Sequence, residues 1–195
     1  MKIFTNLLKR HFLAILRGSS GVVLLASVAC SSNPADGQWI GDEVTNNDFE
    51  SVPGWGWADR TTITRDHAHS GRYAVVVDQH HATGIMFDLP VYEATVQTLA
   101  AVEVDAWVYL PNDKADAVLR MELLADGADA QHPLYGEELA LLSQVSKFKT
   151  WSPVHQIFHL PAGTPGNTHL RLFLKRGTST EPVYLDDIRV RAREW

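Results

Sequence analysis

The chain contains very little cysteine, because Cys30 is the single cysteine among 195 residues. One thiol cannot form a disulfide within the chain. The sequence also lacks the GxSxG, Ser-x-x-Lys and phosphate-loop motifs, which excludes the common nucleophile and nucleotide sites that such motifs mark. The apolar run from Gly21 to Ala29 is too short for a membrane-spanning helix, which takes roughly 20 apolar residues.

The first 35 residues contain no acidic side chain, and the four charged residues before Asp36 are Lys2, Lys9, Arg10 and Arg17. A basic start, a short apolar stretch and small residues predict a secretory signal peptide over residues 1–29. The segment Ser27-Val28-Ala29-Cys30 resembles a bacterial lipobox, although Ser occupies the position where Leu is common. The resemblance implies that Cys30 becomes a lipidated N-terminus. An ordinary signal peptide that happens to contain a cysteine is the alternative.

Cleavage before Cys30 removes four of the 17 basic residues and none of the 23 acidic ones, which leaves a formal net charge of −10. Such an acidic protein is a poor partner for nucleic acid and for anionic lipid headgroups. Membrane contact is therefore expected through the lipid alone. Residues 30–43 are polar with Pro and Gly and predict a tether. We expect a lipid-anchored protein of the bacterial outer membrane or cell surface.

From Val44 onward the pattern predicts β-structure. Thr61 to Thr64 and Arg72 to Val77 are extended segments on either side of a Ser70-Gly71 corner, and the second segment is apolar on both faces. Apolar and polar residues alternate over 101–110, 118–124 and 170–175, as in half-buried antiparallel strands. Residues 137–146 fit either a helical turn or an irregular strand. The sequence predicts one all-β domain over 44–195, an antiparallel β-sandwich of the jelly-roll type.

Five short motifs occur in order along this domain: NNDFE at 46–50, GW at 54–55, AHSGRYAVVV at 68–77, WVYLP at 107–111 and YLDDIRV at 184–190. This order resembles the jelly-roll carbohydrate-binding modules of families 4, 9 and 22, which belong to the galactose-binding-like fold. The resemblance implies a module that binds a poly- or oligosaccharide and does not cleave it, so no enzyme activity is expected. The alternative is a structural or protein-interaction lipoprotein that uses the same fold without a sugar.

Sugar recognition needs flat aromatic faces flanked by polar side chains. The strand over 101–110 is predicted to present Glu103, Asp105, Trp107 and Tyr109 on its polar face, and later strands add further charges to the same surface. Trp55 and Trp57 flank Gly56 in a loop that closes one end, and the pattern leaves open whether they are exposed or buried. Packing within the sandwich is the favoured alternative for Trp107 and Trp151. The residues added by the later strands are Arg120, Glu122 and Arg171.

The resemblance also implies a structural calcium ion, because the related modules bind one between the first strand, the Ser-Gly corner and the closing strand. The corresponding residues here are Asp48, Glu50, Gly71, Asp186 and Asp187. Hard oxygen ligands suit Ca²⁺. Adjacent strand residues point to opposite faces, so either Asp186 or Asp187 faces inward or the strand has a bulge. Pairing of Asp187 with Arg189, or a turn cap, is the alternative.

The histidines give weaker indications. His67 and His69 have a spacing used by metal ligands on an extended segment, but no Glu follows them, so polar corner residues are the favoured interpretation. His155 and His159 lie four residues apart in a strand-like run. Because this spacing does not form a chelate on a strand, both are expected to face solvent.

Overall fold

The computed structural model describes residues 42–56, 60–127 and 132–194. All described residues belong to one compact unit. Cys30, Trp57 and most of the predicted tether lie outside the described residues. No helix among the described residues is long and apolar enough to cross a membrane.

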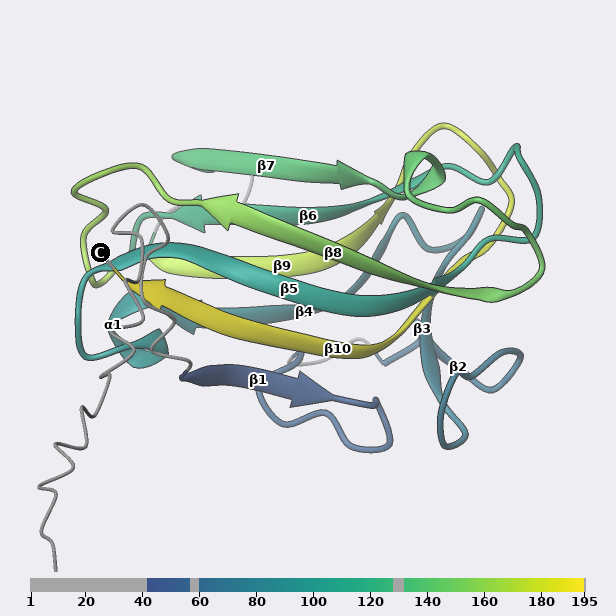
Figure 1. The fold of residues 1–195 in the computed structure, drawn as a ribbon, viewed down its shortest axis with the longest axis horizontal. Coiled ribbons are helices and arrows are strands. Elements are labelled where there is room, and N and C mark those ends of the chain that lie inside the picture. Colours follow the sequence, from purple (N-terminus) through teal and green to yellow (C-terminus); the bar gives the residue numbers. More distant parts are fainter. Residues whose placement is uncertain (1–41, 57–59, 128–131, 195) are drawn as a thin grey trace, which may run out of the picture. The chain divides into compact units, whose positions relative to one another are not determined.

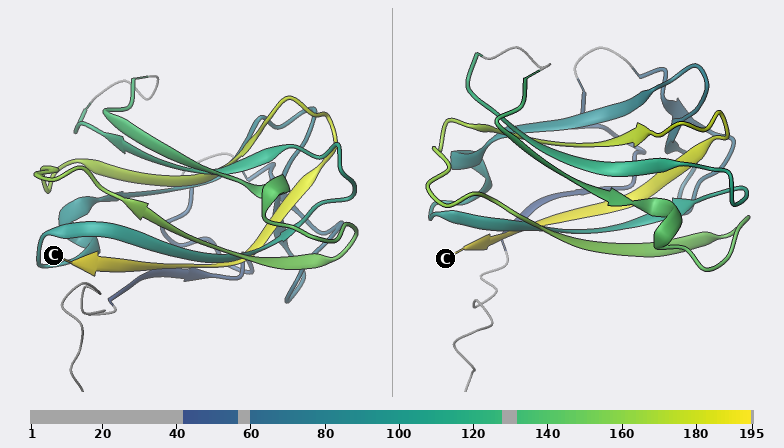
Figure 2. Two further views of the ribbon diagram at one scale, coloured as in Figure 1. Left: turned by 45° about the horizontal axis from the view of Figure 1, so that its top comes forward. Right: turned by 90° about the horizontal axis from the view of Figure 1, so that it is seen from above.

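Two antiparallel sheets form the two layers of a sandwich (Figures 1 and 2). We call them sheet A, with the order β2-β3-β10-β5-β8 and β1 also paired to β10, and sheet B, with the order β4-β9-β6-β7. The strands of sheet A are β1 (Glu43–Asn47), β2 (Ile63–Thr64), β3 (Ala74–Val77), β5 (Leu99–Tyr109), β8 (Trp151–His159) and β10 (Val183–Glu194). Those of sheet B are β4 (Thr83–Pro90), β6 (Ala117–Leu124), β7 (Tyr135–Ala140) and β9 (His169–Arg176).

The predicted all-β antiparallel sandwich is confirmed. The helical elements among the described residues are short, namely α1 (Val91–Ala94) and the 3₁₀ turn η1 (Leu141–Ser143). The ambiguous stretch 137–146 therefore continues β7 and then makes one 3₁₀ turn.

The core lies between the sheets and follows the predicted alternation. On β5, Val102, Val104, Ala106 and Val108 are buried, each at 3% exposure or less, and their neighbours point outward. Leucines at alternate positions of β6 and β9 fill the core from the opposite sheet. Burial of these side chains provides the main stabilisation of a domain that has no disulfide in its described part.

The Ser70-Gly71 corner precedes β3, all four residues of which are buried, as predicted. Gly71 has φ of +57°, and a Cβ atom there would lie 2.5 Å from Glu50 Oε1. Glycine avoids both the backbone strain and this overlap.

The closing strand β10 lies between β5 and β1 (Figure 1), and its residues 183–185 pair with β3. The register with β5 shifts between Asp186 and Arg189, which marks a β-bulge, and Asp187 has φ of +45°. Asp186 is completely buried whereas Asp187 is partly exposed. The predicted bulge is confirmed, and Asp186 is buried beneath the corner residues His69 and Ser70 on the outer face of sheet A rather than in the core.

Candidate functional sites on the two sheet faces

The predicted ligand residues do not form one surface. Glu103, Asp105, Trp107 and Tyr109 lie on β5 in sheet A, whereas the three later residues lie on β6 and β9 in sheet B. Because the core separates the two sheets, outward side chains of one sheet point away from those of the other. The predicted single row is therefore wrong, and two separate surfaces result.

Trp55 does not take part in either surface. It is 1% exposed and packs against Phe49 and Phe87, with ring centroids 5.3 and 5.5 Å apart. Its Nε1 donates a hydrogen bond to Thr45 Oγ1 at 3.3 Å. A residue with this burial belongs to the core, so a stacking role for Trp55 is wrong.

The outer face of sheet A carries six rings that we call the aromatic strip: His67, His69, Trp107, Tyr109, Trp151 and Tyr184. Tyr109 and Trp151 come together because they are register partners on β5 and β8, and Tyr184 is the partner of Tyr109 on β10. Trp107 and Trp151 are half-buried rather than fully buried.

Histidines of the loop before β3 cover two rings of the aromatic strip. The imidazole of His67 stacks on Tyr109 with centroids 4.4 Å apart, and that of His69 stacks on Trp107 at 3.9 Å. The ring faces that a pyranose would contact are therefore occupied by side chains of the same chain. In this arrangement Trp107 and Tyr109 do not provide the predicted stacking platform.

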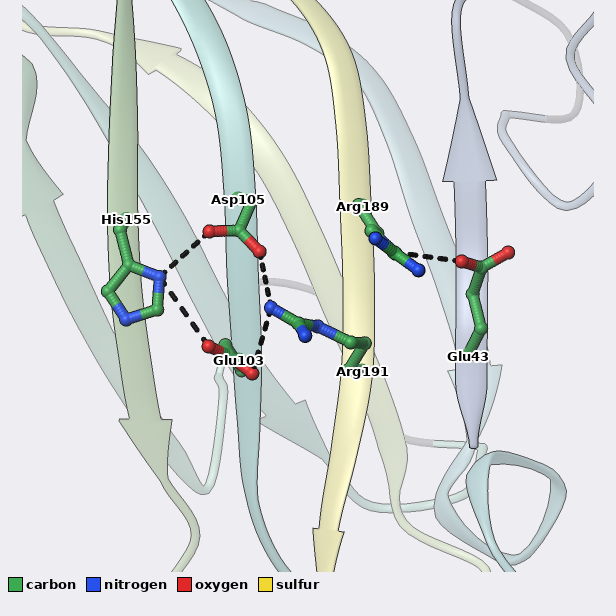
Figure 3. Close-up of polar contacts among 6 residues, drawn as sticks. All are labelled: Glu43, Glu103, Asp105, His155, Arg189 and Arg191. Carbon is green, nitrogen blue, oxygen red and sulfur yellow. Dashed lines mark hydrogen bonds and ion pairs between the residues drawn. The ribbon is translucent and has the colours of Figure 1, made fainter. Parts of the chain in front are cut away.

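A group of charged side chains continues the same face of sheet A (Figure 3). His155 on β8 is the register partner of Asp105, and its Nδ1 lies 2.8 Å from Asp105 Oδ1 and 3.6 Å from Glu103 Oε1. Arg191 on β10 approaches the same two carboxylates from the other side, at 2.6 Å from Asp105 and 3.1 Å from Glu103. We call Glu103, Asp105 and His155 the carboxylate–histidine cluster. It is an arrangement of side chains compatible with a metal site.

Burial acts against ionisation of Asp105, but hydrogen bonds and charge from His155 and Arg191 more than offset it and lower the pKa of this carboxyl. Asp105 is therefore an anion at neutral pH. The sequence did not reveal the role of His155, because its partners come from the neighbouring strand and only the register of β5 and β8 brings them together.

The outer face of sheet B carries what we call the charged band. Glu122 pairs across the sheet with Arg171, which in turn pairs with Asp88 on β4. Arg171 Nε donates to Asp88 Oδ2 at 2.6 Å, and Arg120 donates to Glu122 and to Glu138 on β7. The band consists of Asp88, Arg120, Glu122, Glu138, His169, Arg171 and Lys175.

The side chains of the charged band are held in place by one another, and all but that of Glu122 are at least 20% exposed. His169 Nδ1 lies 2.6 Å from Asp88 Oδ1, and Lys175 Nζ lies 3.7 Å from Glu138. Glu122 is 8% exposed at the floor of the band, whereas the side chain of Glu138 is 39% exposed at its edge. The register partner of Glu122 on β7 is Gly136, which has no side chain that could cover Glu122.

The residues predicted to bind calcium are not arranged as a calcium site. Asp186 Oδ2 accepts the N–H groups of His69 and Ser70 at 2.7 and 3.2 Å, and Asp186 Oδ1 accepts that of Asp187 at 2.8 Å. Asp187 accepts the Ser70 hydroxyl at 2.6 Å and contacts His69, instead of pairing with Arg189.

The other predicted calcium ligands also face N–H donors. Glu50 accepts the backbone N–H groups of Arg72 and Tyr73 near Gly71, and the Arg72 bond does most to lower the Glu50 pKa. Asp48 is exposed and accepts the N–H of Glu50 at 3.1 Å. In this arrangement the predicted calcium residues serve as acceptors for N–H groups. The group of metal-ligand type found in the described part of the chain is the carboxylate–histidine cluster.

This chain is similar to known proteins in its structure only. No protein-family model and no curated protein matches this sequence. The CBM22-1–CBM22-2 tandem domain of Paenibacillus barcinonensis Xyn10C is similar with a TM-score of 0.52 and 18% identity, over 80% of this chain and 47% of that one. The single CBM22-2 xylan-binding domain of the same enzyme gives a TM-score of 0.50 and 16% identity, over 76% and 99%. The chain thus has the jelly-roll fold of carbohydrate-binding modules.

Proposed function

We propose that this chain is a lipid-anchored protein of the bacterial envelope whose β-sandwich domain binds a glycan without cleaving it. The observation that carries the proposal is the charged band on sheet B. It presents carboxylates and guanidinium groups from neighbouring strands, at orientations that their mutual ion pairs fix in advance.

Planar charged groups of this kind can hydrogen-bond two hydroxyls of a sugar at once, and charge-assisted hydrogen bonds are the stronger ones. Groups already held in place lose little freedom on binding, which favours affinity. The seven described residues of the band include no Trp, Tyr or Phe, so we expect modest affinity, with dissociation constants of roughly micromolar to millimolar. The similar CBM22-2 domain is described as xylan-binding, and xylo-oligosaccharides are therefore suitable first probes.

The test is a glycan array probed with the full-length protein in detergent, followed by calorimetry on the best hit. Arg171→Ala and Glu122→Gln are expected to weaken binding at least tenfold, because each removes a charged partner from the band. Arg189→Ala is the matched control, because this arginine is exposed on the opposite sheet and pairs with Glu43 at 2.9 Å. Melting curves check that the variants remain folded.

If no glycan binds, or if the control weakens binding as much as the band variants do, the proposed site is wrong. The protein would then belong to the structural or protein-interaction class, the alternative use of this fold.

The anchor is tested separately. Replacement of Cys30 by Ala should release the protein from membranes or leave an unprocessed precursor of higher mass. A variant that fractionates and migrates like the parent would contradict lipid attachment and the envelope location that depends on it.

A further inference from the structure

We infer that the carboxylate–histidine cluster binds a divalent transition-metal ion of the zinc type, on the opposite sheet from the proposed glycan site. The three side chains each offer one ligand atom, and these atoms lie within 4.8 Å of one another. They come from two paired strands, so the sheet itself holds them in position (Figure 3).

The spacing of the ligand atoms fits a shared ion. Two ligand atoms that each lie about 2.1 Å from a zinc ion are about 3.0 Å apart at the octahedral angle. At the tetrahedral angle they are about 3.4 Å apart. His155 Nδ1 lies 2.8 Å from Asp105 Oδ1 and 3.6 Å from Glu103 Oε1. Shifts of a few tenths of an ångström bring both distances into that range.

Arg191 has the role of an outer group that orients these ligands. Its Nη2 lies 2.6 Å from Asp105 Oδ2 and 3.1 Å from Glu103 Oε2, whereas the other oxygen of each carboxylate faces His155 (Figure 3). Partners of this kind fix the orientation of metal ligands in known sites. One arginine and two carboxylates together carry a net charge of −1, which attracts a cation.

The burial of Glu103 is a second and independent indication. Its side chain is 9% exposed, and while Oε2 pairs with Arg191 at 3.1 Å, Oε1 faces His155 at 3.6 Å, beyond hydrogen-bond distance. Burying a carboxylate with incomplete hydrogen bonding is costly. A divalent ion on the His155 side would offset that cost, and the His155 side chain, at 52% exposure, leaves a path from solvent.

The ligand types select the metal. An imidazole nitrogen with two carboxylate oxygens suits zinc and its neighbours in the first transition row better than calcium, which prefers oxygen ligands alone. Three protein ligands leave at least one position on the ion for water.

The test titrates Zn²⁺ into EDTA-stripped, full-length protein in detergent, in competition with a chromogenic chelator. The parent is expected to bind one equivalent, and His155→Gln and Asp105→Asn should each weaken binding at least tenfold. His159→Gln is the matched control, because His159 is exposed on the same face of β8 but opposite Ala101. The control should bind Zn²⁺ like the parent.

Cobalt substitution gives a second measurement. Co²⁺ bound by this cluster should show the visible absorption bands that are typical of a cobalt ion with few ligands. These bands should disappear in His155→Gln. Arg171→Ala should keep both metals, which separates this site from the glycan site. Absence of stoichiometric binding, or equal binding by the parent and His155→Gln, would overturn the inference.

Discussion

The imidazole of His69 lies flat on the indole of Trp107, with ring centroids 3.9 Å apart and an angle of 14° between the ring planes. The same imidazole contacts the carboxylate of Asp187 on β10. One loop residue therefore fastens the corner before β3 to both β5 and β10, and it covers the ring that the sequence indicated as a sugar platform.

This stack should contribute measurably to stability. His69→Ala is expected to lower the free energy of unfolding by about 1 to 3 kcal/mol, because it removes an aromatic contact and a hydrogen bond to a charged group. The tryptophan emission should also shift to longer wavelength as Trp107 becomes more exposed. Urea denaturation followed by fluorescence measures both effects. His80→Ala, at an exposed position, is the control and should change neither.

Asp186 should make stability depend on pH. Burial raises the pKa of this carboxyl from 3.8 to about 6, since the hydrogen bonds from Asp187, His69 and Ser70 offset only part of the desolvation. The folded state therefore binds the proton more tightly than the unfolded state. The resulting stabilisation is complete below about pH 4 and is lost as the pH rises through about 6, and it amounts to at most about 3 kcal/mol.

The measurement compares the parent with Asp186→Asn by urea denaturation at pH 4, 5, 6 and 7. The excess stability of the parent over the variant should shrink as the pH rises. Carboxyls with lowered pKa, such as Asp78 and Asp105, act in the opposite direction but cancel in this difference. Asp113→Asn, at an exposed position, should show no such trend. A constant difference for Asp186→Asn would contradict the prediction.

Trp55 should behave as a core residue. Trp55→Ala is expected to cost about 3 to 5 kcal/mol of folding free energy, the usual range for removing a buried large aromatic ring. Where the variant is still folded, binding by the charged band should persist. Tyr92→Ala serves as the control, because its side chain is 61% exposed, and it should change stability by no more than about 0.5 kcal/mol. Loss of glycan binding with an unchanged melt would return Trp55 to the ligand site.

Gly71 and Gly127 form a matched pair for testing the crowded corner. Both have positive φ, +57° and +70°, so alanine costs about 1 to 2 kcal/mol in backbone strain at either position. At Gly71 the new Cβ also displaces Glu50 from the N–H groups of Arg72 and Tyr73, whereas nothing lies within 4 Å at Gly127. Thermal melts should therefore show Gly71→Ala as clearly the less stable variant. Equal melting temperatures would contradict this account of the corner.

Calcium should leave the melting temperature unchanged. Glu50 and Asp186 already use their oxygens to accept N–H groups, so a cation would compete with these hydrogen bonds. Melts of the EDTA-treated protein with and without millimolar Ca²⁺ measure the effect. A rise with Ca²⁺ that disappears in Glu50→Gln would show that this corner rearranges to bind the ion.

The sequence alone determined the local structure to a large extent. Alternation over 101–110 placed Val104 inside and Asp105 outside, because side chains alternate across a strand whichever sheet the strand joins. The Ser70-Gly71 corner followed from the freedom of glycine, and two adjacent aspartates required a bulge or a buried charge, both of which occur at Asp186. The order of short motifs indicated the jelly roll.

Only the tertiary structure decided which residues share a surface. Alternation tells the inside of a strand from its outside but does not say which sheet the strand joins. It therefore could not separate Glu103 on sheet A from Arg120 on sheet B, which face in opposite directions. It could not place Trp55 in the core either, because a loop has no regular alternation of side chains from which burial can be predicted. His155 meets Asp105 through the register of two strands whose paired residues lie 50 positions apart in the chain, and that register depends on packing between the sheets and not on any local pattern.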